Sequence, residues 1–515
     1  MADWTSGYVA DLDYTFGYYS ELNPLRVKLA FLNAGIVFPE FGNACELGFG
    51  QGLSANIHAA ASCCSWTGTD FNPSQASFAK ELASASGLET KLYDESFQEF
   101  YDRSDLPNFD YIGLHGIWSW ISDENRKTIV DFIKRKLNVG GVLYVSYNTL
   151  PGWGAFAPMR HLMTEHAEII GSEGAGIVNK INAALDFSEK LLNVDPMYSR
   201  ANPLIGERMK QLKGQNRNYL AHEYFNRDWN PMHFSTFAKW LEPAKVQFVC
   251  SATYPDYIDA LNLKEDQLNF LNSIPDRMFR ESVRDFMVNQ QFRKDYWVKG
   301  ARVLSPMEKL LKLREQKIIL TQYMDDKSLK IKGVIGEVSL QESVYIPLLN
   351  LMSDHKVRSF GEIELALKDI LVFPQIIQAI IILTGIGVFS PVQDEETVTK
   401  VKKQTDKLNL HILQKVKEGY DIGYLASPVL GGGCALNRFQ QLFLASIIDN
   451  SDESQKDDSE LWVSDTWKIL EMQGQKISKN GMVLQTEGEN IEELKDQANN
   501  FKKKILPIIR SLKVI

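Results

Sequence analysis

Three glycines and one acid have the spacing of a turn that binds a nucleotide. In CELGFGQGLSANIHAAASCCSWTGTDFNPSQ, Gly48, Gly50 and Gly52 alternate with other residues, and Asp70 follows 22 positions after Gly48. Glycine has no Cβ atom, so the backbone can turn tightly and a ligand can approach it. An acid at the end of the next strand can accept hydrogen bonds from ribose hydroxyls. The pattern predicts a site for a ligand that contains a nucleoside.

The glycine spacing and a second acid narrow the choice of ligand. A dinucleotide site requires Gly-x-Gly-x-x-Gly, whereas Leu53 holds the sixth position here. Glu46 lies two residues before the turn, where its charge would repel a pyrophosphate and attract a cation. The sulfonium and ammonium groups of S-adenosylmethionine are such cations. We therefore expect S-adenosylmethionine as cofactor and S-adenosylhomocysteine as product, in preference to NAD.

The elements that must position these residues alternate between strands and helices. Apolar segments that predict strands end at the glycine turn, at Asp70 and near Asp94, and two more strands follow in FDYIGLHGIWSW and GGVLYVSYNT. Segments typical of helices lie between them. This alternation predicts a parallel α/β sheet. Such sheets bind ligands at the carboxyl ends of their strands.

Several motifs resemble a known family. ELGFGQG with Asp70 resembles motifs I and II of class I S-adenosylmethionine methyltransferases. LHGIWSWIS (114–122), SYNTLPGW (146–153) and YLAHEYFN (219–226) are similar to segments of bacterial methyltransferases that carry a methyltransferase regulatory domain. That group includes rickettsial lysine methyltransferases that act on outer-membrane proteins. The resemblance covers about residues 10–300 and implies a Rossmann-like methyltransferase sheet.

The resemblance also implies roles for individual residues at the carboxyl edge of the sheet. The residues expected at the cofactor are Tyr14, Glu46, Gly48, Gly50, Gly52, Asp70, Phe71, Asp94, Ser96, Phe97, His115, Gly116 and Trp118. Two alternatives stay open, because Asp94 also fits an exposed loop acid and Trp118 also fits a core aromatic residue.

An amine acceptor must lose its proton before it can be methylated, since a free lysine has a pKa of about 10.4. An aromatic pocket lowers that pKa by desolvation and holds the ammonium form by cation–π attraction. The residues expected to act on the acceptor are Tyr18, Tyr147, Trp153, His222 and Glu223, with Tyr14 and Tyr19 as further pocket candidates. Surface or core tyrosines are the alternative. A zinc site at His222-Glu223 is not expected, because Asn226 replaces the second histidine of HExxH.

Three domains are expected: a class I methyltransferase domain over 1–300, a winged-helix-like domain over 301–395 and a C-terminal α+β domain over 396–515. Within the first, about 155–300 forms a helical insertion and a regulatory segment. HFSTFAKWLEPAKVQFVCSATY is expected to complete the sheet by about residue 255, and ESVRDFMVNQQFRKDYW to form a helix. The later domains are expected to select the acceptor. Gly431–Gly433 is expected to be a flexible loop or turn.

The bulk composition excludes several classes of function. A chain of 515 residues with a net charge of −9 is too long for one core and too acidic for a general nucleic-acid binder. Its five scattered cysteines fit a reducing cytoplasm, no signal peptide is expected, and no metal site is indicated. The apolar run 370–392 contains Pro374, so we expect a buried helix and strand instead of a membrane span.

The residues and motifs of the sequence fit three functions. The first is a protein methyltransferase that modifies lysine side chains, with a surface or outer-membrane protein as the acceptor. The second is a methyltransferase of a glycan or small molecule. The third is an inactive adaptor that binds the cofactor, against which the intact Glu46 and Asp70 argue. The oligomeric state is left open, with a dimer as one option.

Overall fold

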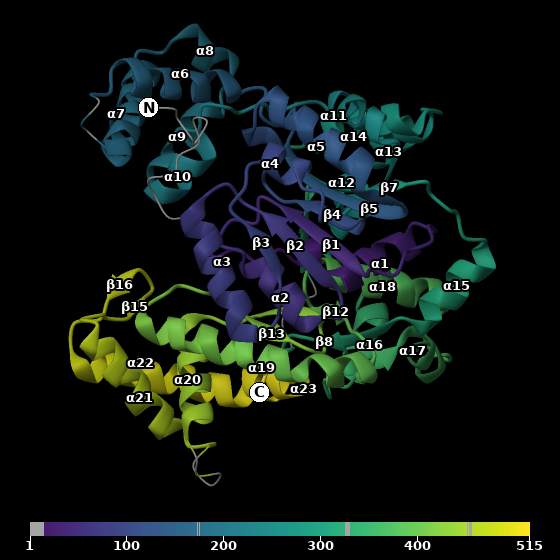
Figure 1. The fold of residues 1–515 in the computed structure, drawn as a ribbon, viewed down its shortest axis with the longest axis vertical. Coiled ribbons are helices and arrows are strands. Elements are labelled where there is room, and N and C mark those ends of the chain that lie inside the picture. The colour runs from purple at the N-terminus through teal and green to yellow at the C-terminus, as the bar shows by residue number, and fades with distance from the viewer. Residues whose placement is uncertain (1–14, 173, 175, 325–329, 451, 453–455) are drawn as a thin grey trace.

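The computed structural model describes residues 15–172, 174, 176–324, 330–450, 452 and 456–515. A mixed sheet of seven strands lies at its centre, in the order β3-β2-β1-β4-β5-β7-β6 (Figure 1). The strands are β1 (Asn43–Leu47), β2 (Ser65–Thr69), β3 (Lys91–Tyr93), β4 (Phe109–Leu114), β5 (Leu137–Asn148), β6 (Val246–Ser251) and β7 (Phe292–Lys299). Strands β1 to β5 are parallel. The predicted Rossmann-like sheet is therefore confirmed.

Helices connect the parallel strands as predicted. Helix α1 (Pro24–Asn33) precedes β1, and the connecting helices are α2 (Leu53–Ala61), α3 (Pro73–Ser86), α4 (Phe97–Asp102) and α5 (Asp123–Lys136). Local sequence signals fix their ends. Asn72 caps the start of α3 through its side-chain oxygen, and Gly87 ends it with a φ of +77°. These connections bring the carboxyl ends of β1 to β5 to one edge of the sheet.

The predicted helix over 281–297 is wrong in its second half. Helix α14 (Arg277–Met287) ends before Asn289, which has a φ of +48°. The chain then enters β7, which pairs antiparallel with both β5 and β6. Its side chains alternate between half-buried and buried at its start, a two-residue period that packing on the sheet favours over the helical period. The sheet is therefore not complete at residue 255.

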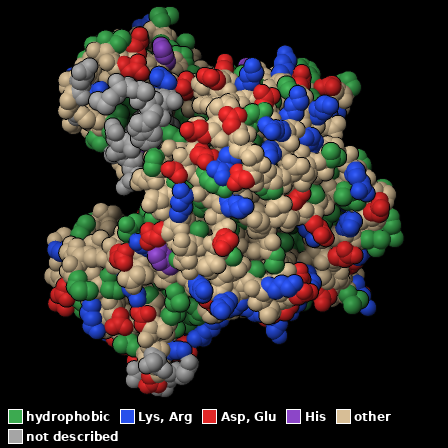
Figure 2. All heavy atoms as spheres, in the orientation of Figure 1, with side chains coloured by type: hydrophobic (Ala, Val, Ile, Leu, Met, Phe, Trp, Pro, Cys, Tyr) green, Lys and Arg blue, Asp and Glu red, His purple; other side chains and the backbone are tan. Residues whose placement is uncertain are grey.

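The segment between β5 and β6 is helical in its described part, as predicted up to residue 220. Its helices are α6 (Ala157–Ile169), α7 (Gly176–Asn193), α8 (Met197–Ala201), α9 (Ile205–Lys213), α10 (Arg217–Tyr224) and α11 (Phe234–Leu241). Helices α6 to α10 form a lobe that projects from the sheet (Figures 1 and 2). The lobe has its own apolar core, which includes Phe156, Met163 and Leu185.

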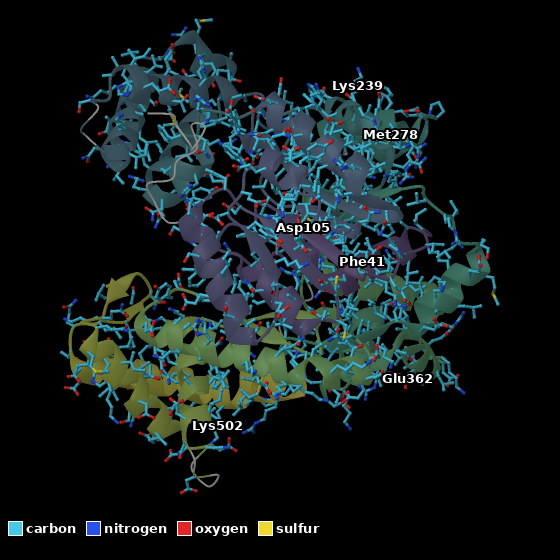
Figure 3. All side chains as sticks on the ribbon, in the orientation of Figure 1. Phe41, Asp105, Lys239, Met278, Glu362 and Lys502 are labelled. Carbon is cyan, nitrogen blue, oxygen red and sulfur yellow. The ribbon has the colours of Figure 1, made fainter. Side chains whose placement is uncertain are left out.

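After β6, the chain forms α12 (Asp259–Asn262), α13 (Glu265–Asn272) and α14. Helices α11 and α14 pack together, and Lys239 and Met278 on these helices lie near each other in Figure 3. Lys and Arg side chains gather on the surface over this region in Figure 2.

Residues 301–391 share one apolar core with the sheet, which joins Phe31 and Tyr296 to Ile380, and the division into domains stays a prediction. The elements of 301–391 are α15 (Pro306–Glu315), β8 (Lys317–Leu320), β9 (Lys330–Gly333), β10 (Gly336–Ser339), α16 (Glu342–Met352), β11 (Arg358–Ser359), α17 (Phe360–Ala366), α18 (Phe373–Gly385) and β12 (Phe389–Pro391). The apolar run thus forms the expected helix and strand, α18 and β12. No helix among the described residues is long and apolar enough to cross a membrane. The winged-helix arrangement stays a prediction.

The C-terminal unit is mainly helical. Its elements are α19 (Glu395–Glu418), β13 (Tyr424–Ser427), β14 (Gly432–Ala435), α20 (Arg438–Asp449), α21 (Ser459–Met472), β15 (Ser478–Lys479), β16 (Met482–Val483), α22 (Glu487–Asn500), a π-helical turn (Phe501–Ile505) and α23 (Leu506–Ser511). Gly432 and Gly433 belong to β14, which pairs with β13. The expectation of a flexible loop at Gly431–Gly433 is therefore wrong for these two glycines, because ladder hydrogen bonds fix them.

This unit packs directly on the helices beside the central sheet. Helix α19 lies against α2 and α3, and β13 and β14 lie against α2. All nine residues of α2 are buried as a result. The chain beyond 391 therefore completes the core around the helix that follows the glycine turn.

Candidate active site

The turn after β1 holds its glycines in the left-handed region of backbone conformation. The φ angle is +73° at Gly48, +59° at Gly50 and +68° at Gly52, values that other residues rarely adopt. Space is limited as well. A Cβ atom at Gly48 would overlap the side chain of Ile117, and one at Gly52 would overlap Ala79. The predicted glycine turn is thus fixed at the carboxyl end of β1.

Two buried acids lie beside this turn. Asp70 is 6% exposed, and its oxygens accept hydrogen bonds from Gly50 N at 2.8 Å and Asn72 N at 3.0 Å. Glu46 is 1% exposed, and its Oε2 has no hydrogen-bond partner among the described residues. Burial raises the pKa of Glu46 to about 8, with a smaller contribution from the charge of Asp70. Burial also raises the pKa of Asp70 to about 6. A cation placed here would stabilise both carboxylates.

The end of β4 contributes a histidine and a glycine. His115 Nδ1 lies 2.8 Å from Tyr144 Oη, and its ring stacks on Tyr19 at a centroid distance of 3.5 Å. Burial lowers the pKa of His115 to about 3, so the ring is neutral at physiological pH. Gly116 N donates to Ser146 Oγ at 2.7 Å, and no atom of the described residues lies within 4 Å of a Cβ built at Gly116. No described residue therefore covers the edge beside His115 at Gly116.

The residues that follow β3 interact with groups of α3 and α4. Asp94 is half-exposed and forms an ion pair with Lys80 at 2.9 Å. Ser96 caps α4, whose first residue is Phe97. These surroundings match the alternative of an exposed loop acid at Asp94. Phe71, which follows Asp70, is half-buried.

Trp118 and Tyr147 lie in the core of the sheet. Trp118 is fully buried, and its indole N–H donates to Met232 Sδ at 3.4 Å. Tyr147 is also buried, stacks on Phe237 at 4.1 Å and donates its hydroxyl hydrogen to Asp295 Oδ2 at 3.0 Å. Both residues match the core alternative in their contacts. Neither side chain has a surface that a ligand could reach without repacking.

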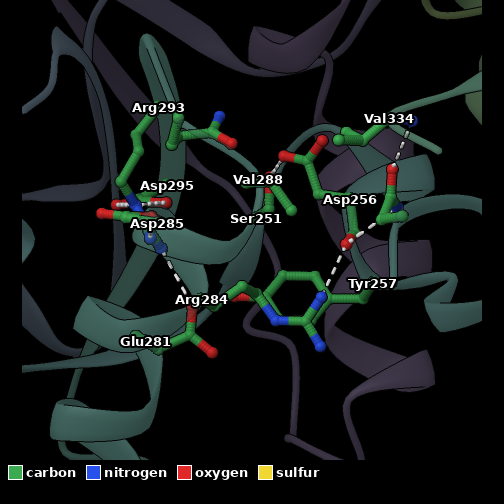
Figure 4. Close-up of a pocket in the computed structure, with 12 residues that line it drawn as sticks. Ser251, Asp256, Tyr257, Glu281, Arg284, Asp285, Val288, Arg293, Asp295 and Val334 are labelled. Carbon is green, nitrogen blue, oxygen red and sulfur yellow. Dashed lines mark hydrogen bonds and ion pairs between the residues drawn. The ribbon is translucent and has the colours of Figure 1, made fainter. Parts of the chain in front are cut away.

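Asp295 belongs to a buried ionic network behind Tyr147. Arg293 forms ion pairs with Asp295 at 2.9 Å, with Asp285 at 2.6 Å and with Glu281 at 3.1 Å (Figure 4). The network borders a cavity of about 30 Å³, which is enough space for a water molecule. Burial raises the pKa of Asp285 to about 7. The network ties α14 to β7 and, through Tyr147, to β5.

The loop after β5 carries Trp153. Its indole N–H donates to Asn148 Oδ1 at 3.0 Å, and the Arg208 guanidinium lies 4.2 Å from its ring centroid. Gly152 N donates to Gln290 O at 2.9 Å, and a Cβ atom at Gly152 would overlap the backbone at Gln290. The loop is therefore held against the segment that connects α14 to β7.

His222 and Glu223 lie on α10, in the helical lobe. His222 is buried, and its carbonyl accepts a hydrogen bond from Asn226 Nδ2 at 2.5 Å. Glu223 is half-buried, and burial raises its pKa to about 7. No group of three or more His, Cys, Asp or Glu residues in the described part of the chain could hold a metal ion.

Most of the predicted residues that do not lie in the core or after β3 fall into two groups. Glu46, the glycine turn, Asp70, His115 and Gly116 meet at the carboxyl edge of β1, β2 and β4. Trp153, His222 and Glu223 belong to the loop after β5 and the lobe. Tyr18 lies between α2 and the C-terminal hairpin, whereas Tyr14 falls outside the described residues.

The sequence prediction missed two residues of α2 beside this edge. Ser54 Oγ accepts a hydrogen bond from Tyr19 N at 3.3 Å, and His58 Nε2 lies 3.1 Å from Tyr18 Oη. Their spacing of four residues on the helix after the glycine turn was the available signal, because such residues share one helix face.

Comparison with known proteins adds to this geometry. Residues 216–299 match the family model described as a predicted methyltransferase regulatory domain. The uncharacterized protein sll1526 of Synechocystis is 40% identical over 517 residues, which cover 99% of each chain. The chain belongs to the class I methyltransferases that carry this regulatory domain. The predicted family is thereby confirmed.

Two rickettsial proteins are also similar to this class I methyltransferase. The uncharacterized protein RP789 of Rickettsia prowazekii is 26% identical over 284 residues, which cover 53% of this chain and 49% of RP789. PKMT2 from Rickettsia typhi, solved in complex with AdoHcy, shares the fold with a TM-score of 0.68 at 17% identity. That match covers 95% of the methyltransferase and 98% of PKMT2, so the likeness in fold extends through the C-terminal unit.

Proposed function

We propose that the protein transfers methyl groups from S-adenosylmethionine to lysine side chains of a protein, with a surface or outer-membrane protein as the favoured acceptor. The proposed cofactor rests on one observation, the environment of Glu46. Its carboxylate is buried at the glycine turn, and one of its oxygens has no partner among the described residues. An unpaired buried carboxylate is costly, and a cationic ligand would remove that cost.

The residues at the edge of the sheet fit this cofactor in three ways. Glu46 would attract its positive charge, the glycine turn would allow close approach to the backbone, and Asp70 would accept hydrogen bonds from the ribose. Asp70 retains this capacity, because a carboxylate oxygen has two lone pairs and each of its oxygens accepts one backbone N–H. S-adenosylmethionine supplies an electrophilic methyl group when bound.

The lobe offers groups that suit an amine acceptor. Glu223 is half-buried and has a pKa of about 7, so near neutral pH it can take a proton from an ammonium group. Aromatic faces in this part of the protein already hold a cation: the Arg208 guanidinium lies 4.2 Å from the ring centroid of Trp153 and 4.4 Å from that of Phe156. Both rings are buried, so an acceptor ammonium would take the place of Arg208 to gain the same cation–π attraction.

A methyl-transfer assay tests both halves of the proposal. Protein, S-adenosylmethionine with an isotopically labelled methyl group, and fractionated envelope or cytosolic extracts are incubated together, and the modified atoms are identified by mass spectrometry. We expect label on lysine nitrogen and a rate that rises with pH towards a plateau, because the free amine is the nucleophile. The matched variant Glu223→Gln should lower the rate most at neutral pH, where Glu223 would otherwise accept the proton.

Label on hydroxyl or carboxylate oxygen, or a rate independent of pH, would contradict the lysine assignment. Such a result would favour the glycan or small-molecule alternative. Absence of any S-adenosylmethionine binding would reject the cofactor as well.

A further inference from the structure

We propose that the C-terminal hairpin β13–β14 positions the cofactor site, and that Gly433 is a positioning residue for cofactor binding. The inference rests on the proposed cofactor site at the glycine turn. It concerns residues 15–23, which we call the strap, because they lie between the hairpin and the carboxyl edge of the sheet. The hairpin comes more than 300 residues after the glycine turn.

The hairpin holds the strap through Tyr18. A Cβ atom at Gly433 would lie 2.9 Å from both Cε2 and Cζ of Tyr18 and 3.0 Å from its Cδ2. The ring of Tyr18 therefore rests on the Cα of Gly433, at a distance that no other residue type allows. The ring of Tyr424, on the other strand of the hairpin, lies 5.0 Å from that of Tyr18 between centroids.

A second contact fixes the other end of the strap. The side-chain amide of Asn23 donates to Leu430 O at 3.0 Å and to Gly431 O at 3.4 Å. Its side-chain oxygen accepts from Leu25 N at 2.8 Å and so caps α1. Asn23 is buried, and its amide thus joins the start of α1 to the hairpin.

The strap in turn contacts the cofactor edge. Tyr18 Oη lies 3.1 Å from His58 Nε2, and Tyr19 N donates to Ser54 Oγ at 3.3 Å. Both partners belong to α2, which begins directly after Gly52. The ring of Tyr19 stacks on His115 at 3.5 Å. A displacement of Tyr18 would therefore move Tyr19 away from the ends of β1 and β4.

The need for glycine at Gly433 is a matter of space and not of backbone conformation. Gly433 has no positive φ, in contrast to Gly48, Gly50 and Gly52. Alanine can adopt its backbone conformation, so the variant Gly433→Ala adds one methyl group against the Tyr18 ring and little else. Overpacking of this kind forces neighbouring groups to shift.

Gly423 provides a matched control in the same hairpin. It immediately precedes β13, it has no positive φ, and a Cβ there would meet no atom of the described residues within 4 Å. Gly423→Ala makes the same chemical change without a steric consequence.

Calorimetry with S-adenosylhomocysteine and hydrogen exchange of residues 15–23 test the inference on the full chain. Gly433→Ala should weaken S-adenosylhomocysteine binding on the order of tenfold. The added methyl group displaces the Tyr18 ring, and part of the binding free energy is then spent on restoring the position of the strap. Exchange in the strap should become faster, while Gly423→Ala should resemble the wild type in both measurements. Unchanged affinity and unchanged exchange in a folded Gly433→Ala protein would overturn the inference.

A double-mutant cycle separates an effect through Tyr18 from general damage to the hairpin. In the Tyr18→Ala background, Gly433→Ala should cause no further loss of affinity, because the ring that it displaces is absent. Independent losses that add would overturn the proposed route. If Gly433→Ala does not fold, Tyr424→Leu provides the test without added volume. It should loosen the strap and weaken binding severalfold, and wild-type behaviour of this variant would count against the inference.

The two readouts also separate this inference from the proposed function. If wild-type protein binds neither S-adenosylmethionine nor S-adenosylhomocysteine, the cofactor assignment fails, but exchange of the strap still reports whether the hairpin holds it. If the wild type binds and Gly433→Ala binds equally well, only the positioning role fails.

Discussion

The carboxyl edge of the sheet and the region around β7 hold their buried polar groups in different ways. At the edge, the Oε2 atom of Glu46 has no partner among the described residues, and none of their atoms lies within 4 Å of a Cβ built at Gly116. Near β7, Asp295 accepts hydrogen bonds from Tyr147 and Arg293, and Arg293 contacts two further carboxylates. Glu46 thus has no ion-pair partner among the described residues, whereas all three carboxylates of the β7 network pair with Arg293, although Asp285 Oδ2 also lacks a hydrogen bond in the described part of the chain.

This difference predicts how substitutions in the two regions should behave. A change at the edge should cost ligand affinity and little folding free energy, because the protein itself makes few contacts through these groups. A change in the β7 network should cost folding free energy and leave cofactor affinity intact.

The largest effect is expected from Arg293→Ala. It leaves Asp295, Asp285 and Glu281 buried without the cation that pairs with all three, and breaking a buried ion pair from one side costs about 3–5 kcal/mol. Urea unfolding should show this loss, while the folded fraction binds S-adenosylhomocysteine normally. Tyr147→Phe is the control, because it removes one hydrogen bond and should cost only about 1 kcal/mol. Equal losses in the two variants would contradict the central role of the ion pair.

Gly50→Arg should abolish cofactor binding, with a loss of about 100-fold or more. The side chain would be forced into a left-handed backbone conformation at the turn itself. Gly474→Arg controls for the backbone strain, since Gly474 also has a positive φ but lies at an exposed site with no atom near its Cβ position. The urea midpoint should show that the two variants are equally stable. Calorimetry should show that Gly474→Arg binds S-adenosylhomocysteine and Gly50→Arg does not.

Asp70→Ala should weaken S-adenosylmethionine binding about tenfold or more. Loss of a charge-assisted hydrogen-bond acceptor costs on the order of 1.5–3 kcal/mol. Asp70→Asn preserves the shape and should lose less, because it keeps one acceptor oxygen. An unchanged affinity in Asp70→Ala would remove Asp70 from the ribose site.

The smallest effect is expected from pH. The pKa of Glu46 is raised to about 8 in the free protein, so the group is mostly protonated at pH 7, and a cation binds its ionised form. Affinity for S-adenosylmethionine should rise with pH, by about fivefold between pH 7 and pH 8, where the ionised fraction of Glu46 grows by that factor. Binding should release a proton, which calorimetry in buffers of different ionisation enthalpy detects. Glu46→Gln should abolish this dependence, and an affinity that falls with pH would contradict it.

The parts of the fold that the sequence predicts correctly have local signals. The glycine turn, Asp70 after β2 and the capped helix α3 all lie within segments whose periodicity and end residues specify them. Strand β7 lacks such a signal, because FRKDYWVK carries four charged residues, and the burial of two of them depends on partners elsewhere in the chain. Arg293 and Asp295 are buried through α14 and Tyr147, and no short window of sequence contains these partners.

The candidate site shows the same limit. Glu46 and the glycines could be identified from their order along the chain, as could His115 at the end of a strand. The role of Gly431–Gly433 could not, because a ring more than 400 residues away sets the space around Gly433. The same holds for the link between Trp153 and Arg208, which depends on how the lobe folds back on the loop after β5.

The burial of α2 by the C-terminal unit has a consequence for synthesis on the ribosome. About 370 residues separate the end of α2 from the hairpin that covers it. At about 5–20 residues per second, translation needs roughly 20–75 s to make that stretch. During this time Leu53, Ile57 and Ala60, which pack against the C-terminal core in the finished protein, have no permanent cover. The nascent chain must therefore keep an apolar helix from aggregating until nearly its whole length has emerged, which makes this segment a natural client for chaperones that bind during translation.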